Sequence, residues 1–317
     1  MSVMLGQLHI PGRREDVLGQ IRNRLHEQGQ TLPDAIRERE LYFRVSVVGT
    51  CNLSCTFCHN EGAPTSGKLT LDTARDAIAA ATRAGFTRVQ LTGGEPLLRA
   101  DIPEFVRMAR EYVDDVGVTT NGTYLPQRLE GLLDAGLSRM HVSLQTEPLE
   151  EAGSADRWGI PPWLMPTVDR AASGLFTLRL NLPVPADALD RTEDFLYLLT
   201  RRGVDIKVFS VLPEGEVRED SYPLTELEAL VARVNSENEG RSAGEVLLRG
   251  FRPPSGIRCA TCSDLARCKE QSHSLRLGAD LVLRPCLATR QWDAPLDLEN
   301  IDTALTEAAL LALDYQW

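Results

Sequence analysis

Between residues 41 and 238 the sequence alternates strand-like and helix-like segments six times. Strands are expected at 41–48, 87–94, 116–122, 138–146, 176–184 and 205–213. The helices that follow them are expected at 69–85, 101–113, 125–136, 161–173, 187–203 and 224–238. Because consecutive parallel strands need a crossover, usually a helix, this alternation predicts an α/β fold with a parallel sheet. Gly85 is expected to end its helix and Asp101 to cap the next one.

The expected strands carry polar side chains on one face and apolar side chains on the other. Residues at i and i+2 of a strand share a face. The polar face comprises Arg44, Ser46, Arg88, Gln90, Thr92, His141, Ser143, Gln145, Arg179, Asn181 and Lys207. Barrel interiors are usually filled by branched apolar side chains, so a polar, cationic interior indicates a chamber for an anionic ligand. We therefore predict a partial (β/α)6 TIM-like barrel. A doubly wound open sheet, with polar strand ends that reach solvent, is the alternative.

Composition limits the classes of partner. The chain of 317 residues has a formal net charge of −11, which argues against a nucleic-acid-binding surface because such surfaces are basic. The sequence has no apolar run of the roughly 20 residues that a membrane helix needs, and we expect no signal peptide. We expect a cytoplasmic protein that acts on a small molecule and binds neither membrane nor nucleic acid.

The seven cysteines form two groups. Cys51, Cys55 and Cys58 follow the first strand, where active sites of barrel folds lie; the others are Cys259, Cys262, Cys268 and Cys286. In a reducing compartment, clustered cysteines are more often metal ligands than disulfides. Three thiolates in one loop can hold a [4Fe–4S] cluster with one iron left open. A structural zinc site, with His59 as fourth ligand, is the alternative.

The spacing CxxxCxxC with Phe57 before the third cysteine, followed by GGEP at 93–96, resembles the radical S-adenosylmethionine (SAM) superfamily. Segments from FRVSVVGTCNLSCTFCHNEG to LRLGADLVLRPCL, about residues 41–290, are similar in order to the GTP 3′,8-cyclase family of molybdenum-cofactor biosynthesis. The resemblance implies that SAM is bound by Phe57, Gly93, Gly94, Glu95, Pro96, Ser143 and Leu212. Glu95 would face the methionine amine, since a carboxylate pairs with an ammonium.

The same resemblance implies that basic and polar residues on the strands bind substrate. These are Arg44, Arg88, Gln90, Thr119, Arg179, Lys207 and Arg276. Three departures from the cyclases concern the substrate. Gln90 stands where they have an arginine, only one of their two auxiliary-loop arginines is kept, as Arg276, with the other position near Ser274, and their C-terminal double glycine is absent from the DYQW end of this sequence. We therefore predict a substrate other than GTP. His59 and His141 receive no assigned role.

The second cysteine group resembles the auxiliary-cluster regions called twitch and SPASM. The cyclases have three cysteines there, and this chain adds Cys268, which we expect to complete a second [4Fe–4S] cluster; a bystander thiol is the alternative. Two clusters imply an electron donor such as flavodoxin or ferredoxin. The expected organisation is a helical extension over 1–40, the barrel over 41–240, and a small auxiliary iron–sulfur domain with a terminal helix over 241–317.

These observations predict a radical SAM enzyme that abstracts a hydrogen atom from a small polar or anionic metabolite in specialised-metabolite biosynthesis, such as a nucleoside, sugar or aminocyclitol. The outcome could be dehydrogenation, epimerisation, decarboxylation or cyclisation. Two alternatives are a GTP 3′,8-cyclase and a peptide-modifying enzyme of the SPASM type. A zinc-binding scaffold is the non-enzymatic alternative.

Overall fold

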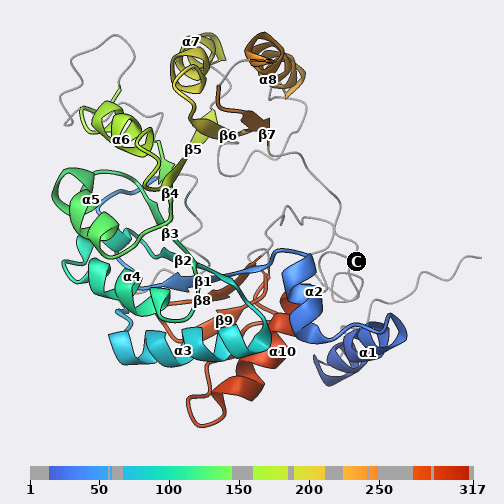
Figure 1. The fold of residues 1–317 in the computed structure, drawn as a ribbon. Coiled ribbons are helices and arrows are strands. Elements are labelled where there is room, and N and C mark those ends of the chain that lie inside the picture. The colour runs from blue at the N-terminus through green and yellow to red at the C-terminus, as the bar shows by residue number, and fades with distance from the viewer. Residues whose placement is uncertain are drawn as a thin grey trace, which may run out of the picture.

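A single curved sheet organises the protein (Figure 1). The computed structural model describes residues 14–55, 58, 67–144, 160–184, 189–210, 224–240, 243–248, 274–286 and 289–313. In these residues ten strands pair in the order β10-β9-β8-β1-β2-β3-β4-β5-β6-β7. The strands are β1 (Tyr42–Ser46), β2 (Arg88–Thr92), β3 (Asp115–Thr120), β4 (Arg139–Ser143), β5 (Thr177–Val184), β6 (Asp205–Ser210), β7 (Val246–Leu248), β8 (Ser274–Leu277), β9 (Val282–Arg284) and β10 (Ala294–Pro295).

The strands from β8 to β7 are parallel, and only β9 and β10 run antiparallel to their neighbours. The sheet bends from β8 and β1 at one end to β6 and β7 at the other, and β10 and β7 are its edges (Figure 1). The predicted α/β fold with a partial TIM-like barrel is confirmed.

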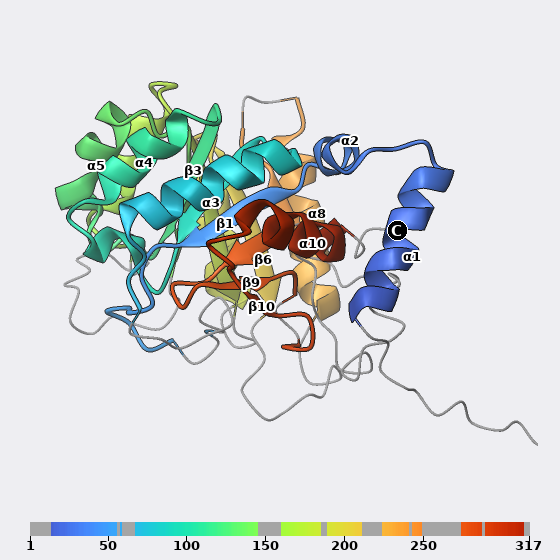
Figure 2. The same cartoon turned by 90° about the horizontal axis from the view of Figure 1, so that it is seen from below.

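Helices cover the outer side of this curved sheet (Figure 1). The helices of the described residues are α1 (Arg14–Glu27), α2 (Leu32–Glu38), α3 (Leu71–Ala84), α4 (Ile102–Arg110), α5 (Leu125–Asp134), α6 (Leu164–Ala171), α7 (Leu189–Thr200), α8 (Leu224–Asn238) and α10 (Ile301–Leu313), with a short 3₁₀ helix η2 (Pro96–Leu98). The terminal helix α10 packs beside α3 and contacts α1 (Figure 2). Among the described helices, none has the length and apolarity that a membrane crossing requires.

The core lies between the outer face of the sheet and these helices. The apolar strand residues Val45, Leu91, Val118, Met140 and Ile206 are completely buried. Burial of such side chains stabilises a fold by roughly 1.5–3 kcal/mol each. The apolar face of the sheet therefore packs against the helices, and the polar face lines the interior of the curve.

Two predicted helix ends have different outcomes. Gly85 ends α3 in the left-handed conformation, with φ of 111°, as predicted. Asp101 occupies the N-cap position of α4 as predicted, but its side chain makes no capping hydrogen bond. Its carboxylate is instead bound by both Nε and Nη2 of Arg99, at 2.9 and 2.6 Å.

Strands β7 to β10 were not expected from the sequence. Each is only two to four residues long, too short for a period-2 pattern to be recognised. Strand β8 pairs in parallel with β1, so residues 274–277 extend the barrel sheet. The separate auxiliary domain over 241–317 stays a prediction.

Candidate active site

Loops that follow β1, β2 and β3 meet at the carboxyl end of the sheet. The first carries Cys51 and Cys58, both exposed, and Cys55, which is half-buried. Phe57 and Leu212, predicted to hold SAM, lie outside the described residues. The loop after β2 contains GGEP, and Pro96 begins η2.

Two glycines let the loop after β2 approach the cysteine loop closely. The Gly94 nitrogen donates to the Val48 carbonyl at 2.8 Å, and the Glu95 nitrogen donates to the Thr50 carbonyl at 2.9 Å. A Cβ on Gly94 would lie 2.1 Å from the Thr50 carbonyl oxygen, and one on Gly93 would lie 2.3 Å from the Val48 carbonyl oxygen. Only a residue without a side chain fits at either position.

Glu95 connects the loop after β2 to the end of β3. Its Oε1 accepts from the Leu97 nitrogen at 2.9 Å and from the Thr120 hydroxyl at 2.7 Å, and its Oε2 accepts from the Asn121 nitrogen at 2.7 Å. Burial raises the pKa of this carboxyl, against these donors. A carboxylate has about four acceptor positions, so Oε2 retains one for a ligand. The predicted contact with the methionine amine stays a prediction.

Asn121 connects the end of β3 to the first cysteine. Its Nδ2 donates to Cys51 Sγ at 3.8 Å and to Asn52 Oδ1 at 3.0 Å. Asn52 in turn donates to the Thr123 hydroxyl at 3.0 Å, and the Leu53 nitrogen donates to Cys51 Sγ at 3.4 Å. The Cys51 sulfur therefore receives two hydrogen bonds, as expected for a thiolate ligand whose orientation is fixed by its surroundings.

The donor set at this mouth fits an iron–sulfur cluster. Three thiols lie within eight positions of one loop, and Cys51 and Cys58 are exposed toward solvent, where a cofactor can reach them. Thiolates are the usual cluster ligands, and three of them leave one iron open.

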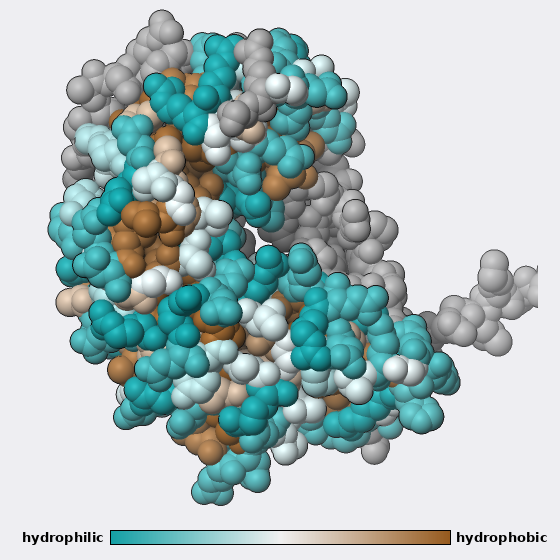
Figure 3. Space-filling view, in the orientation of Figure 1, coloured by the Kyte–Doolittle hydropathy of each residue, from teal (hydrophilic) through white to brown (hydrophobic). Residues whose placement is uncertain are grey.

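Cationic side chains from separate strands face the interior of the curved sheet. Arg44, Lys207 and Arg276 all act on the Tyr42 phenol: burial raises its pKa, but together these three cations lower it. Arg44 lies opposite Arg276 in the β1–β8 register. The molecule is hollowed between the region of α7 and α8 and the region of α1 to α3, and hydrophilic residues border much of this hollow (Figure 3). The predicted polar face is thus an interior surface.

His141 lies among these cations. It faces Thr119 on β3 and Arg179 on β5 in the register of the sheet. Its Nε2 is shielded from solvent and has no hydrogen-bond partner within the described part of the chain. Burial, followed by the charges of Arg139, Arg179, Arg44 and Lys207, lowers the pKa of His141 to about 3.

Gln90 is completely buried and holds two neighbours in place. Its Nε2 donates to the Thr119 hydroxyl at 2.9 Å, and its Oε1 accepts from Arg139 Nη2 at 3.0 Å. The side chain crosses β3 over Gly117, where a Cβ would lie 2.3 Å from Gln90 Oε1. A guanidinium supplied by β4, which is itself paired with Asp115, therefore lies beside Gln90. The contact of Gln90 with substrate stays a prediction.

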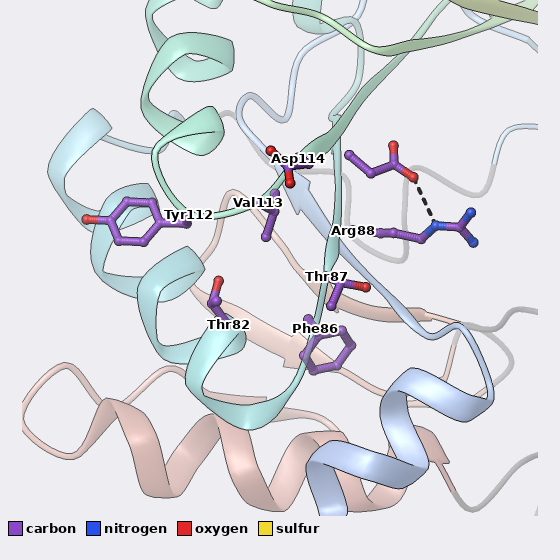
Figure 4. A pocket seen from close by; sticks show the side chains of 8 residues that line it. Thr82, Phe86, Thr87, Arg88, Tyr112, Val113 and Asp114 are labelled. Carbon is purple, nitrogen blue, oxygen red and sulfur yellow. Dashed lines mark hydrogen bonds and ion pairs between the residues drawn. The ribbon is translucent and has the colours of Figure 1, made fainter.

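Arg88 lies at the opposite end of β2, far from the cysteine loop along the strand. Its Nε donates to Asp115 at 2.9 Å (Figure 4), and its Nη1 lies 3.4 Å from Glu40. It borders a surface pocket with residues such as Phe86 and Tyr112, at the amino ends of β2 and β3. Its predicted contact with substrate stays a prediction.

The other predicted site residues are placed as follows. Ser143, at the end of β4, is half-buried, and its hydroxyl accepts from Asn181 at 3.5 Å. Cys286 is buried just after β9, whereas Cys259, Cys262 and Cys268 lie outside the described residues.

Sequence reasoning missed Tyr42 and Arg139. Both share a strand face with residues it did name: Tyr42 is two residues from Arg44, and Arg139 is two residues from His141. The period-2 pattern, extended by one step toward the start of each strand, would have found them.

Comparison with known proteins agrees with this site. Residues 45–223 match the model of the Radical SAM superfamily. The chain is 30% identical to a GTP 3′,8-cyclase of Alkaliphilus oremlandii, over 88% of this chain and 92% of the relative. It is 27% identical to one of Listeria monocytogenes, over 85% of each, and 34% identical to one of Rhizobium leguminosarum, over 59% of this chain and 58% of the relative.

Solved structures share the fold. SuiB of Streptococcus suis bound to its precursor peptide SuiA superposes with a TM-score of 0.59 and 14% identity, over 87% of this chain and 65% of SuiB. The chain thus spans less than two thirds of SuiB. The enzyme anSMEcpe with bound SAM superposes with a TM-score of 0.56 and 14% identity, over 87% of this chain and 82% of that one.

These findings correct the predicted function. The assignment to specialised-metabolite biosynthesis is wrong, because the curated relatives, at 27–34% identity, are GTP 3′,8-cyclases. The family match also decides between the alternatives for the first cysteine group, since the family implies a [4Fe–4S] cluster and SAM rather than structural zinc. This chain is an enzyme of the radical SAM superfamily, related to the GTP 3′,8-cyclases.

Proposed function

We propose that this protein is a GTP 3′,8-cyclase. The observation that carries the proposal is the interior set of cations contributed by five strands. These are Arg44 on β1, Arg139 on β4, Arg179 on β5, Lys207 on β6 and Arg276 on β8. Like charges brought together in a partly shielded space repel one another, and a polyanion in the same space relieves that repulsion.

The positive charge of this interior set is not a consequence of a basic composition. The chain carries a formal net charge of −11, so its positive interior is the reverse of its average. A triphosphate carries the charge opposite to that of such a site, and one guanidinium group can donate two parallel hydrogen bonds to the oxygens of one phosphate. Two of the five are partly compensated by acids: Asp115 binds Arg139, and Asp205 lies 3.5 Å from Arg179. We propose that this group of five cations contacts the phosphates of the substrate.

The cofactor supplies the radical chemistry: when bound, the cluster and SAM together deliver the agent that abstracts a hydrogen atom. The residues of this chain bind and orient. Cys51, Cys55 and Cys58 would hold the cluster. We propose that SAM contacts Phe57, Gly93, Gly94, Glu95, Pro96, Ser143 and Leu212. We propose that the substrate contacts Arg44, Arg88, Gln90, Thr119, Arg179, Lys207 and Arg276.

We also propose a second [4Fe–4S] cluster, held by Cys259, Cys262, Cys268 and Cys286. The strand register supports its location. In the antiparallel β8–β9 pair, Arg276 faces Arg284. Two further residues in that register bring Cys286 to the level of Ser274, which pairs with Tyr42 at the start of β1. Cys286 would then lie at the amino end of the barrel, with the interior set of cations between it and the cysteine loop.

Two cluster sites require electrons from outside the chain. We propose a small electron-transfer protein, a flavodoxin or a ferredoxin, as the donor. Metal analysis of anaerobically reconstituted protein tests the number of clusters: about eight iron atoms per chain indicate two cubane clusters, and about four indicate one.

The substrate proposal is tested by calorimetric binding of GTP and guanosine to SAM-loaded holoenzyme. Because a charge-assisted contact contributes roughly 1.5–3 kcal/mol, Lys207→Met is expected to weaken GTP binding about 10- to 100-fold and to leave guanosine binding unchanged. Arg75→Met is the matched control, since Arg75 is an exposed partner of Asp72 on α3. Equal affinity of the unmodified enzyme for GTP and guanosine would rule out a triphosphate site.

A further inference from the structure

Asn121 lies between the loop that carries the first cysteine group and the loop that carries Glu95. Its backbone nitrogen donates to Glu95 Oε2 at 2.7 Å. Its side-chain Nδ2 donates to Cys51 Sγ at 3.8 Å and to Asn52 Oδ1 at 3.0 Å. One residue at the end of β3 therefore contacts both the first cluster ligand and the carboxylate proposed to receive SAM.

The orientation of the Asn121 amide is determined by its other contacts. Its Oδ1 accepts from the Thr123 nitrogen at 3.0 Å and from the Thr123 hydroxyl at 2.7 Å. A backbone nitrogen can only donate, so the amide oxygen must face Thr123 and the amide nitrogen must face Cys51. Nδ2 carries two hydrogens, one for Asn52 and one for the sulfur. The contact with Cys51 is therefore an N–H···S hydrogen bond, and no amide oxygen is placed against the thiolate.

The turn that carries Asn121 is itself held in place. Gly122 follows with φ of 84°, and its nitrogen donates to the Thr120 hydroxyl at 3.0 Å. A Cβ on Gly122 would lie 2.2 Å from the Trp163 ring, so that ring packs directly on the turn. The Thr120 hydroxyl in turn donates to Glu95 Oε1 at 2.7 Å. The Asn121 donor is thus preorganised toward the sulfur.

We propose that Asn121 is a positioning residue for the [4Fe–4S] cluster, and that its Nδ2–H bond to the Cys51 thiolate raises the reduction potential of that cluster. One-electron reduction adds one negative charge to the cluster and its thiolates, and a donor at a thiolate stabilises the more negative state. Hydrogen bonds to the sulfurs are among the features that set cluster potentials. The inference concerns the cluster that the family implies and does not depend on the identity of the substrate.

Two substitutions separate the donor from the packing of the turn. Asn121→Asp keeps an oxygen for Thr123 and the backbone contact to Glu95, but it has no donor for the sulfur and adds a negative charge. Asn121→Leu is similar in size and uncharged, and it loses both the donor and the Thr123 contacts. If the donor sets the potential, both variants lower it and Asp lowers it more. If Asn121 serves only the structure of the turn, Leu is the more harmful change.

The measurement is an anaerobic redox titration of reconstituted protein with titanium(III) citrate, followed by electron paramagnetic resonance of the reduced cluster. The signal that changes when SAM is added to a parallel sample belongs to the cluster with the open iron. For Asn121→Leu we expect the equilibrium constant of reduction to fall about threefold to tenfold, which equals about 28 to 59 mV for a one-electron couple. For Asn121→Asp we expect a larger fall.

Asn235→Leu is the matched structural control. Asn235 makes two hydrogen bonds with the backbone of Val246, at 2.8 and 2.9 Å, which join α8 to the edge strand β7. The same substitution there should lower the melting temperature and leave the potential unchanged.

A lower potential in both Asn121 variants, with the larger shift for Asp and none for Asn235→Leu, supports the proposal. Unchanged potentials in both Asn121 variants, or a shift in only one of them, would overturn it.

If neither Asn121 variant assembles a cluster, the unmodified protein decides. Asparagine labelled with nitrogen-15 in its side-chain amide is incorporated, and the reduced SAM-responsive cluster is studied by pulsed electron paramagnetic resonance. The hydrogen bond from Nδ2 should produce a nitrogen-15 hyperfine coupling to the cluster. Absence of that coupling would show that no such bond exists and would overturn the proposal.

Discussion

Replacement of Gly94 by alanine is expected to lower the rate of SAM cleavage about a hundredfold or more. The added Cβ would lie 2.1 Å from the Thr50 carbonyl oxygen, 2.3 Å from its carbonyl carbon and 2.8 Å from the Cys51 nitrogen. All three are backbone atoms, so they cannot rotate away, and the loop that carries the first cluster ligand must shift. A misplacement of about 1 Å in a reacting constellation costs roughly 10²-fold in rate.

Gly19→Ala is the matched control for this substitution. Gly19 lies within α1, and a Cβ built on it meets no atom within 4 Å. Alanine there should leave activity unchanged and stabilise the protein by roughly 0.5–1 kcal/mol. The measurement is formation of 5′-deoxyadenosine from SAM with dithionite as reductant, normalised to iron content. Cleavage by Gly94→Ala at the unmodified rate would show that the close approach of the two loops is unnecessary.

The second large effect concerns stability. Arg99→Met is expected to lower the free energy of unfolding by about 3 kcal/mol. The Arg99 side chain is only 4% exposed, and its Nη1 donates to the carbonyls of Val47 and Leu69, at 2.9 and 2.6 Å. Its guanidinium also lies 4.2 Å from the centre of the Phe105 ring. The substitution removes these contacts together with the ion pair to Asp101.

The expected loss is near the lower end of the range for a broken buried pair, because Asp101 is 38% exposed and water can replace its partner. Urea unfolding of the reconstituted protein, followed by circular dichroism, measures the loss. The control is Arg75→Met, which breaks an exposed pair and should cost about 0.5 kcal/mol or less. Equal midpoints for the two variants would exclude a structural role for Arg99.

The same pair has a pH dependence of known sign. The hydrogen bonds from Arg99 lower the pKa of Asp101 below its usual 3.8. A carboxyl whose pKa is lower in the folded state stabilises the fold above its unfolded value, and this contribution is lost as the pH falls toward the folded value. The stability difference between the unmodified protein and Arg99→Met should therefore narrow in acid.

The curved sheet could be predicted because its central strands repeat one pattern. The apolar residues at alternate positions, such as Val45, Leu91 and Met140, must pack against the helices. The polar residues between them must therefore face the interior of the curved sheet. The position of the cysteine loop at the carboxyl end of β1 follows from the same strand order. These features depend on local periodicity and can be recognised in one sequence.

Features that depend on a partner distant in sequence could not be predicted. The Asp101 carboxylate was expected to cap α4, but Arg99 competes for it more strongly. The hydrogen bond from Arg139 to Gln90, across 49 residues of sequence, could not be predicted either. The alternation of residues along a strand predicts which face of the sheet a side chain lies on. It does not predict which side chain it contacts across the barrel. The strands β8 to β10 were missed for a related reason, since their pairing with β1 and with one another is their main signal.

As a GTP 3′,8-cyclase, this protein should abstract a hydrogen atom from GTP that is bound among the interior cations near the cysteine loop. A bond at carbon 3′ can form only if the hydrogen on that carbon leaves. Anaerobic holoenzyme should therefore be incubated with SAM, dithionite and GTP deuterated at carbon 3′, and the mass of the 5′-deoxyadenosine measured. We expect singly deuterated 5′-deoxyadenosine, formed in step with the loss of GTP. Undeuterated 5′-deoxyadenosine alongside unconsumed GTP would contradict this expectation.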